Sequence, residues 1–293
     1  MAKKYKFLGL VVLAALFVSV MWLIIQGKNH GILAPSGEIA TRQAEILYLT
    51  AGLSLIVVIP VFILTFWFAY KYREGNKKAK YAPELSGNTW LEIIWWGIPL
   101  ALITFLAVVT YNTSHSLDPF KPLNSTKQPL NVQVIALQWR WLFIYPEQKI
   151  ASVNYFYIPT DRPVKFSITS DAPMNSFWIP QLGGQIYAMS GMKTDLNLNA
   201  EKPGVYEGSS ANISGQGFAN MRFKVQAGSD NEFGSWVSSV KKSGSVLTLA
   251  SYGKLSQPSQ NTATIYYGQA ENGIFDNVIM KYMMPMNDPR TSR

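Results

Sequence analysis

Three long apolar runs occupy the first 111 residues, and the rest of the chain alternates between short apolar and polar segments. The runs cover residues 7–25, 46–70 and 93–111, and none of them contains Asp, Glu, Lys or Arg. A helix rises about 1.5 Å per residue, so each run is long enough to cross a hydrocarbon layer of about 30 Å. The pattern therefore predicts membrane-spanning helices followed by a globular domain.

The basic residues near these runs predict their orientation. They gather before the first run and after the second, at Lys3, Lys4, Lys6, Lys71, Arg73, Lys77, Lys78 and Lys80. By the positive-inside rule, the N-terminus and the loop 71–90 face the cytoplasm, whereas residues 27–45 and everything after 111 lie outside. We expect a multi-pass protein of a bacterial cell (inner) membrane with a periplasmic or external C-terminal domain.

The first run belongs either to a signal peptide or to an uncleaved anchor span, within residues 1–26. Its length exceeds the usual apolar core of a signal peptide, and the residues around Met21 and Trp22 form no small-residue cleavage site. The chain has no cysteine that could carry a lipid anchor. We expect a retained anchor, with the cleaved signal as the alternative.

The pattern of short segments in the external part of the chain is typical of an all-β domain. Strand-like segments separated by Gly, Pro, Asn and Asp are predicted at 130–145, 164–169, 194–199 and 222–226. Many short strands over roughly 100 residues indicate a Greek-key barrel or sandwich. Helical spacing follows at 233–241 and 274–284. The predicted division is therefore an anchor or signal at 1–26, an external loop at 27–45, a transmembrane hairpin at 46–111, an external β-domain at 112–227 and a helical extension at 228–293.

The surplus of positive charge follows from membrane topology. The net charge is +9, but ten of the 26 basic residues precede Asn112 and lie near the ends of the apolar runs. Nucleic acid is therefore not an expected partner. The external part carries 16 Lys or Arg and 12 Asp or Glu without a cluster of carboxylates. Docking of a basic cytochrome c would need such a cluster, so we do not expect it.

The residue inventory limits the metal chemistry that this chain can perform. It has no cysteine, and its only histidines are His30 and His115. No Cys-containing metal site or disulfide can form. A bis-histidine haem stays an alternative, but both histidines lie near span ends, where solvated or interfacial imidazoles are the simpler interpretation. We expect no metal and no cofactor in this chain.

One segment has the spacing of a binuclear copper loop but not its ligands. Such a loop needs two thiolates four residues apart, an imidazole four residues later and a thioether three residues beyond that. These positions hold Ser210, Ser214, Phe218 and Met221, with Asn212 between the serines, and a second imidazole position upstream holds Asn175. Hydroxyl, amide and phenyl groups do not suit copper, which prefers thiolate, thioether and imidazole ligands.

This combination resembles subunit II of the haem–copper oxidases, in the quinol-oxidase branch and most of all in the bo-type ubiquinol oxidases. The resemblance implies a cupredoxin-like barrel without copper, with the haems and the remaining copper on subunit I. It further implies a proton-pumping complex that oxidises membrane quinol and reduces oxygen to water, in which this chain contacts subunit I and other oxidase subunits. The alternatives are a membrane-anchored binding or assembly module outside an oxidase, and an enzyme that uses menaquinol rather than ubiquinol.

Four further residues are functional candidates. Trp139, Arg140 and Trp141 match an aromatic segment of that family, and Trp and Arg are common interface anchors, so we expect them to contact subunit I. Glu92 immediately precedes the third apolar run, at its cytoplasmic end, where an acidic group can mark a proton path. The family has a glutamate there, beside the inner mouth of the proton channel called the K pathway. A capping box with Thr89 as N-cap is the alternative role for Glu92.

Overall fold

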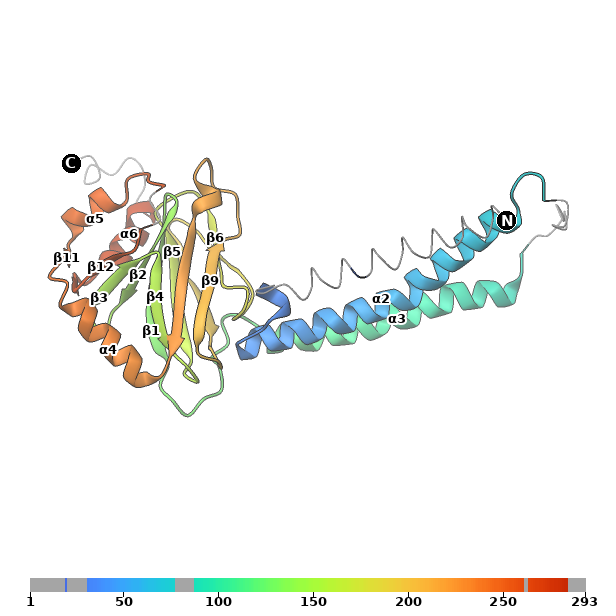
Figure 1. The fold of residues 1–293 in the computed structure, drawn as a ribbon, viewed down its shortest axis with the longest axis horizontal. Helices are drawn as coiled ribbons and strands as arrows, with labels where there is room; N and C mark the ends of the chain where they lie inside the picture. The colour runs from blue at the N-terminus through green and yellow to red at the C-terminus, as the bar shows by residue number, and fades with distance from the viewer. Residues whose placement is uncertain (1–18, 20–30, 77–86, 261–262, 284–293) are drawn as a thin grey trace.

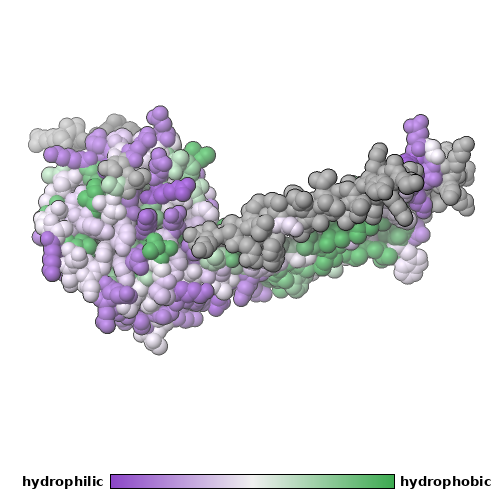
Figure 2. All heavy atoms as spheres, viewed as in Figure 1, coloured by the Kyte–Doolittle hydropathy of each residue, from purple (hydrophilic) through white to green (hydrophobic). Residues whose placement is uncertain are grey.

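The structure, a computed structural model, describes residues 19, 31–76, 87–260 and 263–283. A pair of long helices extends from one end of a β-rich domain (Figure 1). Figure 2 shows apolar residues gathered along the helical pair, whereas polar residues dominate the visible face of the domain. The predicted first span at 7–25 lies outside the described residues.

The two long helices are α2 (Glu38–Lys71) and α3 (Thr89–Ser116), and both are apolar and long enough to cross a membrane. Their apolar side chains are exposed in the isolated chain, as expected for helices that face lipid or other subunits. Pro60 and Pro99 lie inside them. The two apolar helices of the predicted hairpin are confirmed, but the prediction of a loop throughout 27–45 is wrong. The helix α2 begins at Glu38, and η1 (Gly31–Leu33) precedes it.

The external domain consists of two main sheets. The six-stranded sheet has the order β12 (Ile265–Tyr267), β3 (Ile150–Val153), β2 (Arg140–Tyr145), β1 (Leu130–Leu137), β5 (Val164–Ser170) and β8 (Thr194–Leu198). The five-stranded sheet has the order β4 (Tyr155–Pro159), β10 (Arg222–Gly228), β9 (Gly204–Ser210), β6 (Asn175–Trp178) and β7 (Ile186–Ala188). Non-sequential strands are neighbours: β1 pairs in parallel with β5, and β4 in parallel with β10.

Aromatic side chains join the two sheets into one core. Phe177 of β6 and Phe223 of β10 stack with their ring centroids 5.1 Å apart. From the other sheet, Trp141 meets Phe177 edge-on at 5.4 Å, and Phe143 meets Phe223 edge-on at 5.3 Å. Burial of these large rings supplies much of the hydrophobic stabilisation of the domain. The predicted Greek-key type of β-domain is confirmed.

The predicted strand at 130–145 is two strands that form a hairpin. β1 ends at Leu137, β2 begins at Arg140, and the strands pair antiparallel. Trp139 lies between them with a φ of 69°, in the left-handed region that a β-strand does not use. The prediction missed this turn because Gln138 and Trp139 carry no Gly, Pro, Asn or Asp signal.

The C-terminal extension contains the helices predicted at 233–241 and 274–284, and it also contains short strands that were not predicted. Its helices are α4 (Asp230–Lys241), α5 (Leu249–Leu255) and α6 (Ile274–Met283). β12 pairs with β3 at the edge of the six-stranded sheet, and β11 (Val246–Leu247) pairs with β13 (Gln269–Ala270). The extension shares a second apolar core with the outer face of β2 and β3, and Ile274, Phe275 and Val278 of α6 are buried in it.

Candidate functional site

The candidate site is formed by β6, β9 and the loop that follows β9. We call residues 211–221 the β9–β10 loop. Antiparallel pairing of β6 with β9 brings Asn175 and Ser210 together although 35 positions separate them. The hydroxyl of Ser210 donates a 2.9 Å hydrogen bond to Oδ1 of Asn175, and both side chains are buried. Two of the predicted copper-ligand positions therefore hold a neutral hydroxyl–amide pair.

Further hydrogen bonds satisfy the amides at this site. Nδ2 of Asn175 donates to the carbonyl of Pro173 at 2.7 Å. Nδ2 of Asn212 donates to the carbonyl of Met174 at 2.9 Å, which ties the β9–β10 loop to the segment before β6. A buried polar group is tolerated when it is hydrogen-bonded, and these bonds supply the partners. The arrangement is a polar structural contact.

The indole of Trp139 lies against the part of the β9–β10 loop that holds Ser214 and Gly217. Its Nε1 donates a 3.2 Å hydrogen bond to the carbonyl of Ser214. The hydroxyl of Ser214 is buried without a hydrogen-bond partner among the described residues. Phe218 begins η2 (Phe218–Asn220) and is half-buried, whereas Met221 is almost fully buried. The indole lies so close to Gly217 that an added Cβ would be 2.3 Å from the ring.

This donor set does not fit a binuclear copper centre. The structure brings Asn175, Ser210 and the β9–β10 loop together, as the spacing predicts, but it supplies no thiolate or imidazole. Met221 contributes the single thioether of the set. Among the described residues, no group of three or more His, Cys, Asp or Glu could hold a metal ion. The side chains at two of the copper-ligand positions, Ser210 and Asn175, are hydrogen-bonded to each other.

Only one of the three predicted interface residues offers a partly exposed side chain. Trp139 is half-buried. Arg140 is buried and donates to the carbonyls of Leu255 and Gln257 in the C-terminal extension, the latter at 3.2 Å. Burial lowers the pKa of Arg140 below its usual value, although Tyr267 opposes the shift. Trp141 is fully buried in the aromatic core. This chain encloses the side chains of Arg140 and Trp141 itself, and the subunit I contact of the three residues stays a prediction.

Glu92 lies in the first turn of α3, and its side chain is exposed in this chain. The N-cap is Asn88, whose Oδ1 accepts hydrogen bonds from the backbone N–H of Trp90 at 3.0 Å and of Leu91 at 3.3 Å. Thr89 is therefore the first helical residue. The capping-box alternative is wrong, because Glu92 lies one position beyond the place where such a glutamate would return to the N-cap.

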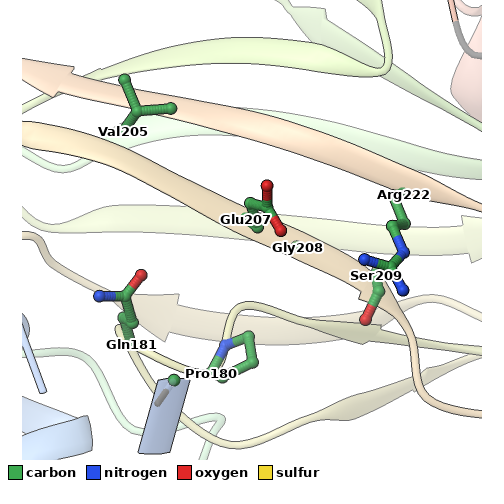
Figure 3. A pocket seen from close by; sticks show the side chains of 8 residues that line it. Pro180, Gln181, Val205, Glu207, Gly208, Ser209 and Arg222 are labelled. Carbon is green, nitrogen blue, oxygen red and sulfur yellow. The ribbon is translucent and has the colours of Figure 1, made fainter. Parts of the chain in front are cut away.

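Two features of the domain were not predicted. Asp171 is a buried carboxylate with partners in the C-terminal extension, and its only sequence signal is its place before β6. The second is a cavity of about 300 Å³ on the outer face of β9 and β10, near η1 (Figure 3). Glu207 and Arg222 line it, together with Pro180. It is separate from the candidate site, since neither Asn175 nor Ser210 nor any residue of the β9–β10 loop lines it.

The fold and the site define a class: a membrane-anchored external domain of subunit II type whose copper-ligand positions hold other side chains. Residues 148–228 match the family described as cytochrome c oxidase subunit II, periplasmic domain, and residues 241–286 match the family described as COX aromatic rich motif. The β-domain is therefore cupredoxin-like.

Curated relatives are similar over most of the chain. It is 46% identical over 260 residues to cytochrome bo(3) ubiquinol oxidase subunit 2 of Pseudomonas putida, which covers 89% of this chain and 83% of that protein. It is 46% identical over 262 residues to ubiquinol oxidase subunit 2 of Acetobacter aceti, covering 89% and 85%. Quinol oxidase subunit 2 of Bacillus subtilis is 41% identical over 251 residues, covering 85% and 78%. The chain belongs to the family of quinol oxidase second subunits.

Proposed function

We propose that this chain is the second subunit of a membrane complex that oxidises quinol, reduces oxygen to water and moves protons outward. Its relatives are named as subunits of ubiquinol or quinol oxidases. In this proposal the haems and copper belong to subunit I, and this chain has no redox centre of its own. Its role is to cover subunit I on the outer side and to stabilise the assembled complex.

The observation that carries the proposal is the hydrogen bond between Ser210 and Asn175 at two copper-ligand positions. An external copper centre is useful when a water-soluble protein delivers electrons from outside the membrane. Quinol is lipid-soluble and delivers electrons from within the bilayer, so neither a docking face nor a copper relay is needed. The alternative of a binding module outside an oxidase is not favoured by the names of the relatives.

The choice of electron donor tests this proposal. We would purify the complex through a tag on this chain and measure oxygen consumption with a short-chain quinol and with reduced cytochrome c. The expected result is a haem-containing complex that consumes oxygen with quinol and not with cytochrome c. Turnover with cytochrome c, or purification of this chain without a haem protein, would refute it.

We further propose that the protein lies in the bacterial inner membrane with its β-domain on the periplasmic side. The two apolar helices and the match to a periplasmic domain support this placement. Reporter fusions at Lys78 and at Gly228 should give opposite signals, cytoplasmic for the first and external for the second. Equal signals would contradict the positive-inside argument.

Glu92 is the residue of this chain that we propose for proton uptake. It lies on the cytoplasmic side of the proposed topology, at the start of α3, and its carboxylate is not engaged in a capping box. Acidic groups at membrane helices commonly mark proton paths. The favourable interaction of a carboxylate with the positive helix N-terminus is an additional role, since Glu92 lies in the first turn.

A further inference from the structure

The C-terminal extension reaches the candidate site through a buried carboxylate. The side chain of Asp171, in the segment that joins β5 to β6, is fully enclosed. Its Oδ2 accepts a 2.7 Å hydrogen bond from the hydroxyl of Tyr252 in α5. Its Oδ1 accepts 2.7 Å bonds from Nζ of Lys281 and from the hydroxyl of Tyr282, both in α6. Three donors from the extension therefore converge on one carboxylate of the barrel.

These three hydrogen bonds stabilise the buried carboxylate of Asp171. A buried carboxylate is stable only when it is paired and hydrogen-bonded, and bonds to an ionised group are about twice as strong as neutral ones. Burial lowers the pKa of Lys281, but the hydrogen bond and charge of Asp171 outweigh this effect, so the pKa is raised overall. Burial and the charge of Asp171 both raise the pKa of Tyr252. The extension thus supplies the groups that make the burial of Asp171 tolerable.

The same extension holds the turn between β1 and β2. Arg140 donates to the carbonyls of Leu255 and Gln257 at the end of α5, where helix carbonyls lack partners and attract cations. The backbone N–H of Ser259 donates to the carbonyl of Gln138 at 3.3 Å. The stretch 252–259, in and after α5, therefore contacts both the β1–β2 turn and the carboxylate before β6.

The β1–β2 turn and the segment that leads into β6 in turn contact the β9–β10 loop. From the β1–β2 turn, Trp139 donates to the carbonyl of Ser214. From the segment before β6, the carbonyl of Met174 accepts a 2.9 Å hydrogen bond from Nδ2 of Asn212. In β6 itself, the carbonyl of Ser176 accepts a 3.0 Å hydrogen bond from the N–H of Ala211. A shared metal ion would cross-link such segments by coordination. In this chain, hydrogen bonds that end in the extension form the cross-link.

We propose that the C-terminal extension (residues 229–260 and 263–283) functions as a clamp that orders the β1–β2 turn, the segment before β6 and the β9–β10 loop in a domain whose donor set does not fit a copper centre at this place. This function of the extension goes beyond the proposed oxidase role and does not depend on it. In this proposal, Arg140 and Asp171 have the same role, because each joins the barrel to the extension. The clamp also explains why Tyr252 and Leu255, on one short helix, contact both segments.

The competing view is that the extension only buries apolar surface on β2 and β3. On that view, removing the Tyr252 hydroxyl of α5 disturbs the β9–β10 loop no more than removing another buried tyrosine hydroxyl of the domain does. Tyr206 provides the matched control, because its hydroxyl donates to the carbonyl of Lys202, away from the clamp. Tyr252→Phe and Tyr206→Phe each remove one such hydroxyl.

Hydrogen exchange of the full-length chain in detergent separates the two views. We would follow peptides from the β9–β10 loop and normalise them to peptides from β1 and β5. For Tyr252→Phe and, separately, Arg140→Lys, the clamp predicts that exchange in the loop rises about tenfold relative to the strands, as expected for the loss of one buried hydrogen bond. Tyr206→Phe should leave this ratio unchanged.

Two outcomes would overturn the proposal. The first is an unchanged ratio in Tyr252→Phe or in a folded Arg140→Lys. The second is an equal rise in the ratio for Tyr206→Phe, which would show that the loop responds to any loss of stability. Since Tyr252→Phe only deletes a hydroxyl while Lys281 and Tyr282 still pair with Asp171, we expect this variant to fold.

Discussion

Asn199 of the external domain caps the helix α2 at Glu38. Its Oδ1 accepts a 3.0 Å hydrogen bond from the backbone N–H of Glu38, the first residue of α2. The N-cap residue itself is Gly37, which has no side chain for this purpose, and a Cβ there would lie 2.3 Å from the carbonyl oxygen of Asn199. The N–H of Ala40 donates to the carbonyl of Leu182 at 3.2 Å. The domain thus provides the cap that the helix lacks.

Loss of this cap should loosen the junction between membrane and domain. We predict that Asn199→Ala lowers the stability of the chain by about 1 kcal/mol, the usual effect of removing an N-cap. Asn199→Asp keeps an acceptor oxygen and should preserve most of the stability. Thermal unfolding in detergent measures both variants. A wild-type unfolding midpoint for Asn199→Ala would show that Asn199 is not the cap.

The close packing of Trp139 on the β9–β10 loop gives a second prediction. Gly217→Ala should destabilise the domain by about 1–3 kcal/mol, because the added Cβ would overlap the indole. Gly234→Ala is the matched control, since Gly234 lies in the exposed part of α4 with no atom near the added Cβ. It should raise stability by up to about 1 kcal/mol through helix propensity. Equal effects of the two changes on the unfolding midpoint would refute the close packing.

Tyrosines whose pKa is raised in the folded domain predict a loss of stability at alkaline pH. Burial raises the pKa of Tyr145, Tyr252 and Tyr282, and it raises that of Tyr155 to about 12. A group whose pKa is higher in the folded state stabilises it fully below the unfolded pKa and loses this contribution as the pH rises. Since unfolded tyrosine titrates near pH 10, stability should fall between about pH 10 and pH 12. An unfolding midpoint that stays constant over this range would contradict the prediction.

Glu92 can be tested by two substitutions in the assembled complex. If it takes up protons, Glu92→Gln and Glu92→Ala should both slow quinol oxidation, by about tenfold or more. If it only favours the helix N-terminus, both should lose about 0.3–1 kcal/mol of stability and keep wild-type turnover. Steady-state quinol oxidation by complexes with a full haem content is the measurement. Wild-type turnover in Glu92→Gln would exclude proton uptake through this residue.

The sequence predicts those parts of the fold that depend on local composition. The spans at 46–70 and 93–111 lie within α2 and α3 because uncharged apolar length alone decides which residues can enter a bilayer. The start of α2 at Glu38 could not be predicted, since its cap is Asn199, 161 positions away. The turn at Trp139 was missed for a similar reason: its positive φ accompanies packing on Gly217 rather than a local turn signal.

The candidate site likewise has features that local sequence predicts and features that depend on distant contacts. Residue identity alone at Ser210, Ser214 and Phe218 predicts the loss of copper ligands, because ligand chemistry does not depend on the fold. The contacts that replace a metal are not predictable from spacing. Asp171 meets Tyr252 and Lys281 across 81 and 110 positions, and no local pattern marks the three as partners. Such contacts become visible only when the extension is placed against the barrel.

The copper content of the purified chain tests the central claim most directly. The full-length chain, isolated without subunit I, would be incubated with copper, treated with a weak chelator and analysed for bound metal. The account predicts no stoichiometric copper, because Ser210 is hydrogen-bonded to Asn175 and Phe218 offers no ligand atom. Cysteines at positions 210 and 214 and histidines at 175 and 218 should restore binding in a matched variant. Tightly bound copper in the unmodified chain would contradict the account.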